Sequence, residues 1–349
     1  MTDLEILLRG VAAGAALATA AGMSRGAHPG PARWTGAVFC LSVAAFAVHS
    51  GGAESRALGP VLWIASLLSA AGTGYFWLFA ITLFDDQRFD PRRLAPIAVL
   101  TIVAAIGWSL PRPTANGVWV VHNLLEVVLV VHVFAVIGRS WRGDLVEARR
   151  TLRGPFLAAV ALYAAVLSGF EIAEALGYEA AWVGLAQAAT LVAMSLAGAL
   201  VLLHPRPGLF EAPPRAPAPA AIDGKDGVLL AKLQALMQGD EIWRREGLTI
   251  GQLAAAVGTP EHRLRRLIND GLGHRNFAEF LNARRIRAAR EGLADPERAE
   301  VSISELAFEL GYASLGPFNR AFKEATGMTP TAWRAQALAA ASPNSEKPR

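Results

Sequence analysis

Residues 303–333 read ISELAFELGYASLGPFNRAFKEATGMTPTAW, and an earlier stretch of the 349-residue chain repeats the same pattern. In both stretches a short apolar helix is followed by a glycine turn and a second helix. Leu253-Ala254 corresponds to Leu306-Ala307, and Gly258 corresponds to Gly311. Alanine allows another helix to cross closely, and glycine permits the left-handed backbone of a tight turn. The repeat is typical of two helix-turn-helix units in an all-α domain.

The second helix of each unit carries an apolar face and, opposite it, a polar stripe with i, i+3, i+4, i+7 spacing. The stripe residues are His262, Arg265, Arg266 and Asn269 in the first unit and Gly316, Asn319, Arg320 and Lys323 in the second. Arginine and asparagine hydrogen-bond to base edges in the major groove. Between Arg263 and Arg290, eight arginines outnumber two acidic residues, which suits a phosphate backbone. We therefore predict that both stripes bind double-stranded DNA; a solvated helix face is the alternative interpretation.

Longer motifs surround these stripes. They run from Leu248-Thr249-Ile250 to Asn282-Ala283-Arg284-Arg285-Ile286 in the first half, and from Ile303-Ser304-Glu305-Leu306-Ala307 to Gly327-Met328-Thr329-Pro330 in the second. Over about Val228–Ala337 the chain resembles the DNA-binding domain of the AraC/XylS family of transcriptional regulators. The resemblance implies two helix-turn-helix units joined by a helix at about Phe277–Leu293. It also implies promoter DNA, RNA polymerase and a second copy of the chain as partners.

The resemblance further implies which residues contact bases. The family's base-contact positions are occupied by His262, Arg265 and Arg266 in the first unit and by Leu315, Gly316 and Arg320 in the second. Gly316-Pro317 replaces the polar pair that is usual there, so we expect the second unit mainly to hold phosphates. The soluble sensor usual in the family has no counterpart in residues 1–204, so the family's effectors are not expected here.

The first two thirds of the chain are apolar and poor in charge. Only 15 of the 33 Lys and Arg residues precede Lys225, and 18% of all residues are charged, against about 25% in soluble proteins. Long apolar stretches with almost no charge predict membrane-spanning helices. We predict seven, at Leu7–Met23, Trp34–His49, Leu58–Phe84, Leu94–Leu110, Gly117–Gly138, Pro155–Ala173 and Ala180–His204. The first could be taken for a signal peptide, but the acidic Asp3 and Glu5 before it favour a retained helix.

Arginine is distributed unevenly over the loops between the predicted spans. Loops after spans one, three and five carry ten arginines, and loops after spans two, four and six carry two. Basic loops stay on the cytoplasmic side. We therefore predict a multi-pass protein of the bacterial inner membrane, with its N-terminus outside and the DNA-binding part in the cytoplasm. The lipid bilayer is thus an expected partner.

Ionisable residues within predicted spans are candidates for function. His122 and Glu126 lie four residues apart on one helix face, and they form a candidate membrane sensing site; hydrogen bonding between helices is the alternative. Gly72-Thr73-Gly74 is predicted to be a kink or a close-packing site. The chain has no HExxH, GxSxG or Walker-type motif. We therefore predict no catalytic residue, cofactor or metal, and no enzyme activity.

These patterns predict an all-α protein with a seven-helix membrane domain at 1–204, a Pro/Ala-rich linker at 205–224, an AraC-type DNA-binding domain at 225–340 and a disordered tail at 341–349. The leading hypothesis is a membrane-embedded, sequence-specific transcriptional regulator whose membrane domain senses an unknown signal. Two alternatives stay open. One is a membrane transporter or enzyme with an autoregulatory DNA-binding domain, and the other is a regulator that is merely anchored to the membrane.

Overall fold

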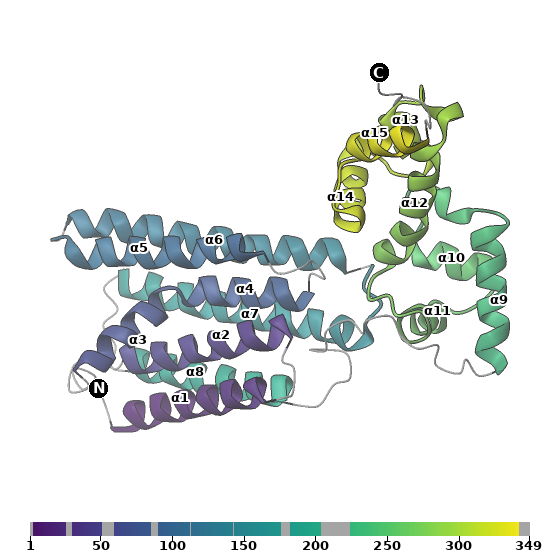
Figure 1. The fold of residues 1–349 in the computed structure, drawn as a ribbon. Coiled ribbons are helices and arrows are strands. Elements are labelled where there is room, and N and C mark those ends of the chain that lie inside the picture. The colour runs from purple at the N-terminus through teal and green to yellow at the C-terminus, as the bar shows by residue number, and fades with distance from the viewer. Residues whose placement is uncertain are drawn as a thin grey trace, which may run out of the picture. The chain divides into compact units, whose positions relative to one another are not determined.

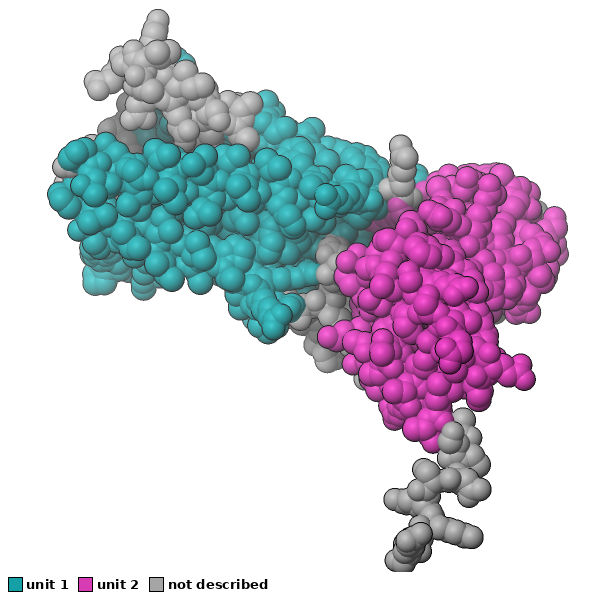
Figure 2. Space-filling view, turned by 90° about the horizontal axis from the view of Figure 1, so that it is seen from above, with its two compact units in different colours: residues 1–142, 147–212 teal, residues 143–146, 213–349 magenta. Residues whose placement is uncertain are grey.

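The computed structural model describes residues 3–25, 30–50, 59–84, 90–111, 113–141, 143–175, 182–203 and 224–341. Over these ranges the regular structure is helical, with a single isolated bridge between Asp144 and Asn276. The chain forms two compact units: unit 1 comprises residues 1–142 and 147–212, and unit 2 comprises residues 143–146 and 213–349 (Figure 2). The predicted linker and tail lie almost wholly outside the described residues.

Unit 1 is a bundle of long helices that run side by side (Figure 1). They are α1 (Asp3–Ser24), α2 (Pro31–His49), α3 (Pro60–Ala70), α4 (Gly72–Phe84), α5 (Ala95–Ser109), α6 (Thr114–Ser140), α7 (Glu147–Ala175) and α8 (Trp182–Leu203), with a 3-10 turn at Pro91–Leu94 before α5. The first helix packs against both α2 and α8, and α6 packs against α4 and α5. Neighbours in the bundle are therefore not always neighbours in the sequence.

Several described helices have the length and composition of membrane spans. Five qualify singly, namely α1, α2, Pro91–Ser109, α6 and α8, and the bent pair of α3 and α4 makes a sixth if it is one span. The remaining predicted span lies on α7, whose side chains from residue 164 onward are outside the described residues. These helices are compatible with membrane insertion.

The surface of α6 fits the same environment. Its side chains of Leu124, Val128 and Val131 are 60%, 63% and 61% exposed, whereas Val133 and Ile137 are buried in the core of the bundle. A continuous apolar stripe of this kind is unfavourable in water. Lipid acyl chains would cover it at no such cost, as expected of a helix on the outside of a membrane bundle.

The glycine-rich stretch at the start of α4 is both a kink and a close-packing site, and that prediction is confirmed. The axis bends by 51° between α3 and α4. Three residues into the second helix, a Cβ on Gly74 would lie 3.1 Å from Cγ1 and 3.2 Å from Cα of Ile97. Only glycine lets α5 approach the α4 backbone so closely.

Unit 2 is a smaller helical array, and among its described residues it also contains the isolated bridge between Asp144 and Asn276. It contains α9 (Gly224–Gln238), α10 (Ile250–Val257), α11 (Glu261–Arg266), α12 (Phe277–Ala294), α13 (Ile303–Glu309), α14 (Leu315–Thr326) and α15 (Pro330–Ala341), with a π turn at Leu267–Gly271 and 3-10 turns at Ile242–Arg244 and Pro296–Arg298. Within the unit, α12 runs between the pair α10–α11 and the pair α13–α14 (Figure 1).

Local chemistry sets the ends of the two short first helices. Thr249 and Gln252 form a capping box at the start of α10, and the Ser302 hydroxyl accepts a hydrogen bond from the Glu305 N–H at the start of α13. Gly258 and Gly311 then take left-handed φ angles of 76° and 82° in the turns that follow. These caps and turns hold α11 and α14 in place as the second helix of each pair.

Candidate nucleic-acid interface

In the first helix pair, α11 packs on the core through one face. Leu264 and Ile268 are fully buried, whereas His262 and Arg266 are exposed. Asn269 is half-buried, and its side-chain amide donates to the Asp270 carboxylate at 2.8 Å. The structure thus brings His262 and Arg266 to the surface as the stripe predicts.

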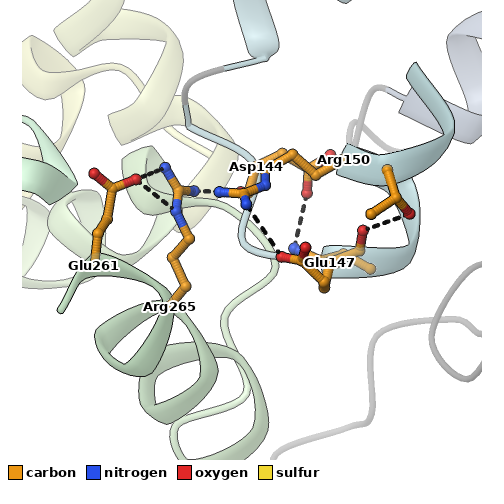
Figure 3. Close-up of polar contacts among 7 residues, drawn as sticks. Asp144, Glu147, Arg150, Glu261 and Arg265 are labelled. Atoms are coloured by element: carbon orange, nitrogen blue, oxygen red, sulfur yellow. Dashed lines mark hydrogen bonds and ion pairs between the residues drawn. The ribbon is translucent and has the colours of Figure 1, made fainter. Parts of the chain in front are cut away.

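Arg265 is placed differently from the expectation that it lies on an exposed stripe. Its side chain is 5% exposed. The guanidinium donates from Nε to the Glu261 carboxylate at 2.9 Å and from Nη1 to the backbone carbonyl of Asp144 (Figure 3). In this state the donors of Arg265 are turned to protein groups and not to solvent.

The cover over Arg265 is the segment Gly143–Val146, which belongs to unit 2 although it lies between α6 and α7 in the sequence. Leu145 N–H donates to the Arg275 carbonyl at 2.9 Å, and Phe277 N–H donates to the Gly143 carbonyl at 2.8 Å. Sequence reasoning missed this segment. Its only signal is an apolar Leu145-Val146 pair inside a loop that is otherwise charged.

In the second helix pair, α14 is strongly two-faced. Phe318 and Phe322 are fully buried and make edge-on ring contacts with Tyr312 and Trp333, respectively, at centroid distances of 5.3 Å and 6.0 Å. The predicted stripe is exposed throughout; its members are Gly316, Asn319, Arg320 and Lys323. Pro317 is tolerated because it lies in the first turn, where a backbone N–H has no helical partner.

The arginine excess of unit 2 is only partly available to a phosphate backbone. Arg285 is buried on α12, where it donates to the carbonyls of Trp243 and Arg245 and stacks over Tyr312. Burial lowers the pKa of Arg285, and burial raises the pKa of Tyr312 to about 12, so that its hydroxyl stays protonated and donates to Asn282.

Other arginines of the same stretch are also engaged. Arg275 is buried, and Arg263 pairs with Asp226 at 2.9 Å. Arg287 and Arg290 remain on the exposed surface of α12, the latter with its guanidinium over the Trp333 ring. A net charge counted along the sequence therefore overstates the number of cations that can meet DNA.

In unit 1, His122 and Glu126 lie together as their spacing predicts. His122 is 5% exposed, with Nδ1 4.0 Å from a Glu126 carboxylate oxygen. Its Nε2 lies 3.1 Å from the carbonyl of Ala70, at the break between α3 and α4. Trp119 packs edge-on against the imidazole at 5.6 Å. Among the described residues, no group of three or more His, Cys, Asp or Glu is arranged to hold a metal ion.

Comparison with known proteins finds a family match for most of unit 2. Residues 253–336 match a family model described as a helix-turn-helix domain, of the AraC type. The C-terminal unit contains an AraC-type helix-turn-helix domain. The match covers α10 to α15 in large part and so includes both helix pairs. It carries no information about unit 1.

Three curated relatives, from Staphylococcus aureus strains MSSA476, N315 and MW2, are named as uncharacterized HTH-type transcriptional regulators. Each is 32% identical to this chain over 94 residues, which is 27% of this chain and 12% of the relative. The chain thus spans about an eighth of the length of the curated relatives that it matches. No solved structure matches the chain. The helix-turn-helix domain suggests DNA binding by unit 2.

Proposed function

We propose that the protein is a membrane-embedded, sequence-specific regulator of transcription whose membrane helices sense a signal. The observation that carries the proposal is the exposure of His262 and Arg266 on α11 and of the whole polar stripe on α14, within a domain that matches a helix-turn-helix family model. Each stripe lies on the second helix of its pair, which is the helix that enters the major groove in such units. The long apolar helices of unit 1 supply the membrane part of the proposal.

The two stripes are proposed to do different work. On α11, His262 and Arg266 offer directional donors that can address base edges. On α14, Gly316 and Pro317 have no side-chain donors, while Arg320 and Lys323 suit phosphate oxygens. We therefore assign base reading mainly to the first helix-turn-helix unit and phosphate anchoring mainly to the second.

Binding measurements at several salt concentrations test this division. Arg266→Ala should weaken binding to a cognate promoter site about ten- to a hundredfold, because a bidentate arginine–base contact discriminates by about 1–3 kcal/mol. Its effect on random DNA should be much smaller. Lys323→Ala should weaken both DNAs alike and reduce the salt slope by about one phosphate contact.

The matched control is Lys232→Ala, since Lys232 is exposed on α9, outside both helix pairs. It should leave both affinities and the salt slope nearly unchanged. Cognate sites come from mapping the chromosomal positions that the protein occupies. Equal loss of cognate and random binding in Arg266→Ala would assign that residue to phosphate, against the proposal.

The sensing role is proposed to involve His122 and Glu126. This role is supported by the position of the His122 imidazole, which lies beside the Ala70 carbonyl at the break between α3 and α4. If the imidazole exchanged this carbonyl for another hydrogen-bond partner, the bend between the two helices could change. Glu126→Gln should shift the growth conditions that induce a target promoter while leaving membrane insertion and DNA affinity intact. Thr101→Val is the control, because the Thr101 hydroxyl bonds only within its own helix, to Ile97. An unchanged induction profile in Glu126→Gln would assign the pair to helix packing.

A further inference from the structure

The segment Gly143–Val146 is held by unit 2 in the manner of a short added strand. Its two backbone hydrogen bonds, with Arg275 and Phe277, flank the bridge between Asp144 and Asn276. This is the antiparallel pattern in which the bridged residues form a non-hydrogen-bonded pair. The attachment is therefore directional and in a single register.

Side chains strengthen the attachment. Leu145 is 3% exposed and belongs to the same core cluster as Leu264, Ile268 and Phe277. Val146 is 4% exposed, and its N–H donates to the Asp144 carboxylate at 2.9 Å, which shapes the turn. Burial of Leu145 in the core of unit 2 exceeds what a connection between two helices requires, because connecting loops normally lie at the surface.

The docked segment limits what Arg265 can bind. The Arg265 guanidinium is enclosed between the Glu261 carboxylate and the Asp144 carbonyl, and both contacts use the donors that a base edge would need. Arg265 stands on α11 between His262 and Arg266, at a position predicted to contact bases. While the segment is docked, this arginine cannot reach DNA.

Residues 143–146 are joined to helices α6 and α7 by very short connections. Two residues separate this segment from Ser140 at the end of α6, and none separates it from Glu147 at the start of α7. Displacement of either helix is therefore transmitted through the backbone to residues 143–146. The candidate sensing residues His122 and Glu126 lie on α6 itself.

We propose that residues 143–146 are an autoinhibitory strand: docked, the strand sequesters Arg265, and withdrawn by movement of α6 or α7, it releases Arg265 to read bases. This inference rests on the proposed function, and it names the element through which the membrane domain regulates DNA binding. It requires no change in the fold of the helix-turn-helix domain, only the loss of one strand and of the contacts to Arg265.

Two variants of the full chain, in lipid nanodiscs, fix the strand in opposite states. Leu145→Asp places a charge in the apolar core and expels the strand. Asp144→Cys with Asn276→Cys, made in a Cys40→Ala background, locks it, because a non-hydrogen-bonded pair has Cα atoms about 4.5 Å apart, within the range of a disulfide. The reduced form of the locked variant is its own control.

The expected result is a difference in cognate affinity between the two states. The Leu145→Asp protein should bind a cognate promoter duplex about ten- to a hundredfold more tightly than the oxidised double-cysteine protein, the span of one arginine–base contact. Reduction should restore the affinity of the locked protein towards the unlocked level. The Leu145→Asp protein and the oxidised double-cysteine protein should bind a random duplex of the same length with equal affinity. Adding Arg265→Ala to Leu145→Asp should abolish the gain.

Each other outcome contradicts the proposal in its own way. Equal cognate affinity of the expelled and locked proteins would make the segment a structural support without a regulatory role. Failure of the two cysteines to cross-link under mild oxidation would contradict the docked strand. If Leu145→Asp unfolds the domain, as monitored by amide hydrogen exchange, the oxidised and reduced forms of the locked protein decide the question alone, and equal affinities there overturn the proposal. A failure to distinguish cognate from random DNA in every protein, wild type included, would refute the proposed function instead.

Discussion

Gly311→Ala is expected to destabilise unit 2 by about 2–5 kcal/mol, which is a large fraction of the total stability of an ordinary domain. The left-handed backbone at this position, with φ of 82°, costs an alanine about 1–2 kcal/mol. In addition, the new Cβ would overlap the Arg244 carbonyl carbon and oxygen and press on the Arg285 guanidinium. Relieving such overpacking costs about 1–3 kcal/mol more.

Gly258→Ala is the matched control. Gly258 occupies the equivalent turn of the first helix pair with φ of 76°, but no atom lies within 4 Å of the added Cβ. Gly258→Ala should therefore lower the free energy of unfolding only by the cost of the left-handed backbone conformation, about 1–2 kcal/mol. Pulse proteolysis of the full chain in urea, followed by cleavage within residues 224–341, measures both variants. Equal losses at the two glycines would mean that the approach of Arg244 to Gly311 is not a feature of the folded protein in solution.

Reporter fusions should give an all-or-none pattern along the membrane part. A reporter that is active only in the periplasm should be active after Arg56 or Tyr178 and silent after Arg150 or Pro207. The physical reason is the ten-to-two excess of arginine in alternate loops, since basic loops are retained in the cytoplasm. A cytoplasm-only reporter at the same four positions should give the complementary pattern.

The opposite pattern of activity would place the helix-turn-helix domain outside the cytoplasm, where it could not meet the chromosome. Activity at both Arg56 and Pro207 would instead mean an even number of spans between these two positions. That outcome would leave DNA binding untouched as a property of unit 2. It would remove the membrane-embedded arrangement from the proposed function.

Several features could be predicted from sequence because they depend on local spacing. The apolar faces of α11 and α14 bury Leu264, Ile268, Phe318 and Phe322 completely, as their helical periodicity requires. The kink in front of α4 follows from glycines that favour close packing over a straight helix. The pairing of His122 with Glu126 follows from four-residue spacing on one helix.

The sequence by itself determined an all-helical chain with an apolar N-terminal part and a C-terminal repeat, because helix periodicity, capping residues and turn glycines act over a few neighbouring positions. Only the tertiary structure decided which of the predicted DNA-contacting groups are free. Arg265 meets a carbonyl 121 residues away, and Arg285 meets carbonyls 40 and 42 residues away. Such contacts depend on the long-range packing of the chain, which spacing along a helix does not encode. The docking of residues 143–146 is of the same kind, since an apolar pair in a charged loop does not specify the surface that will bury it.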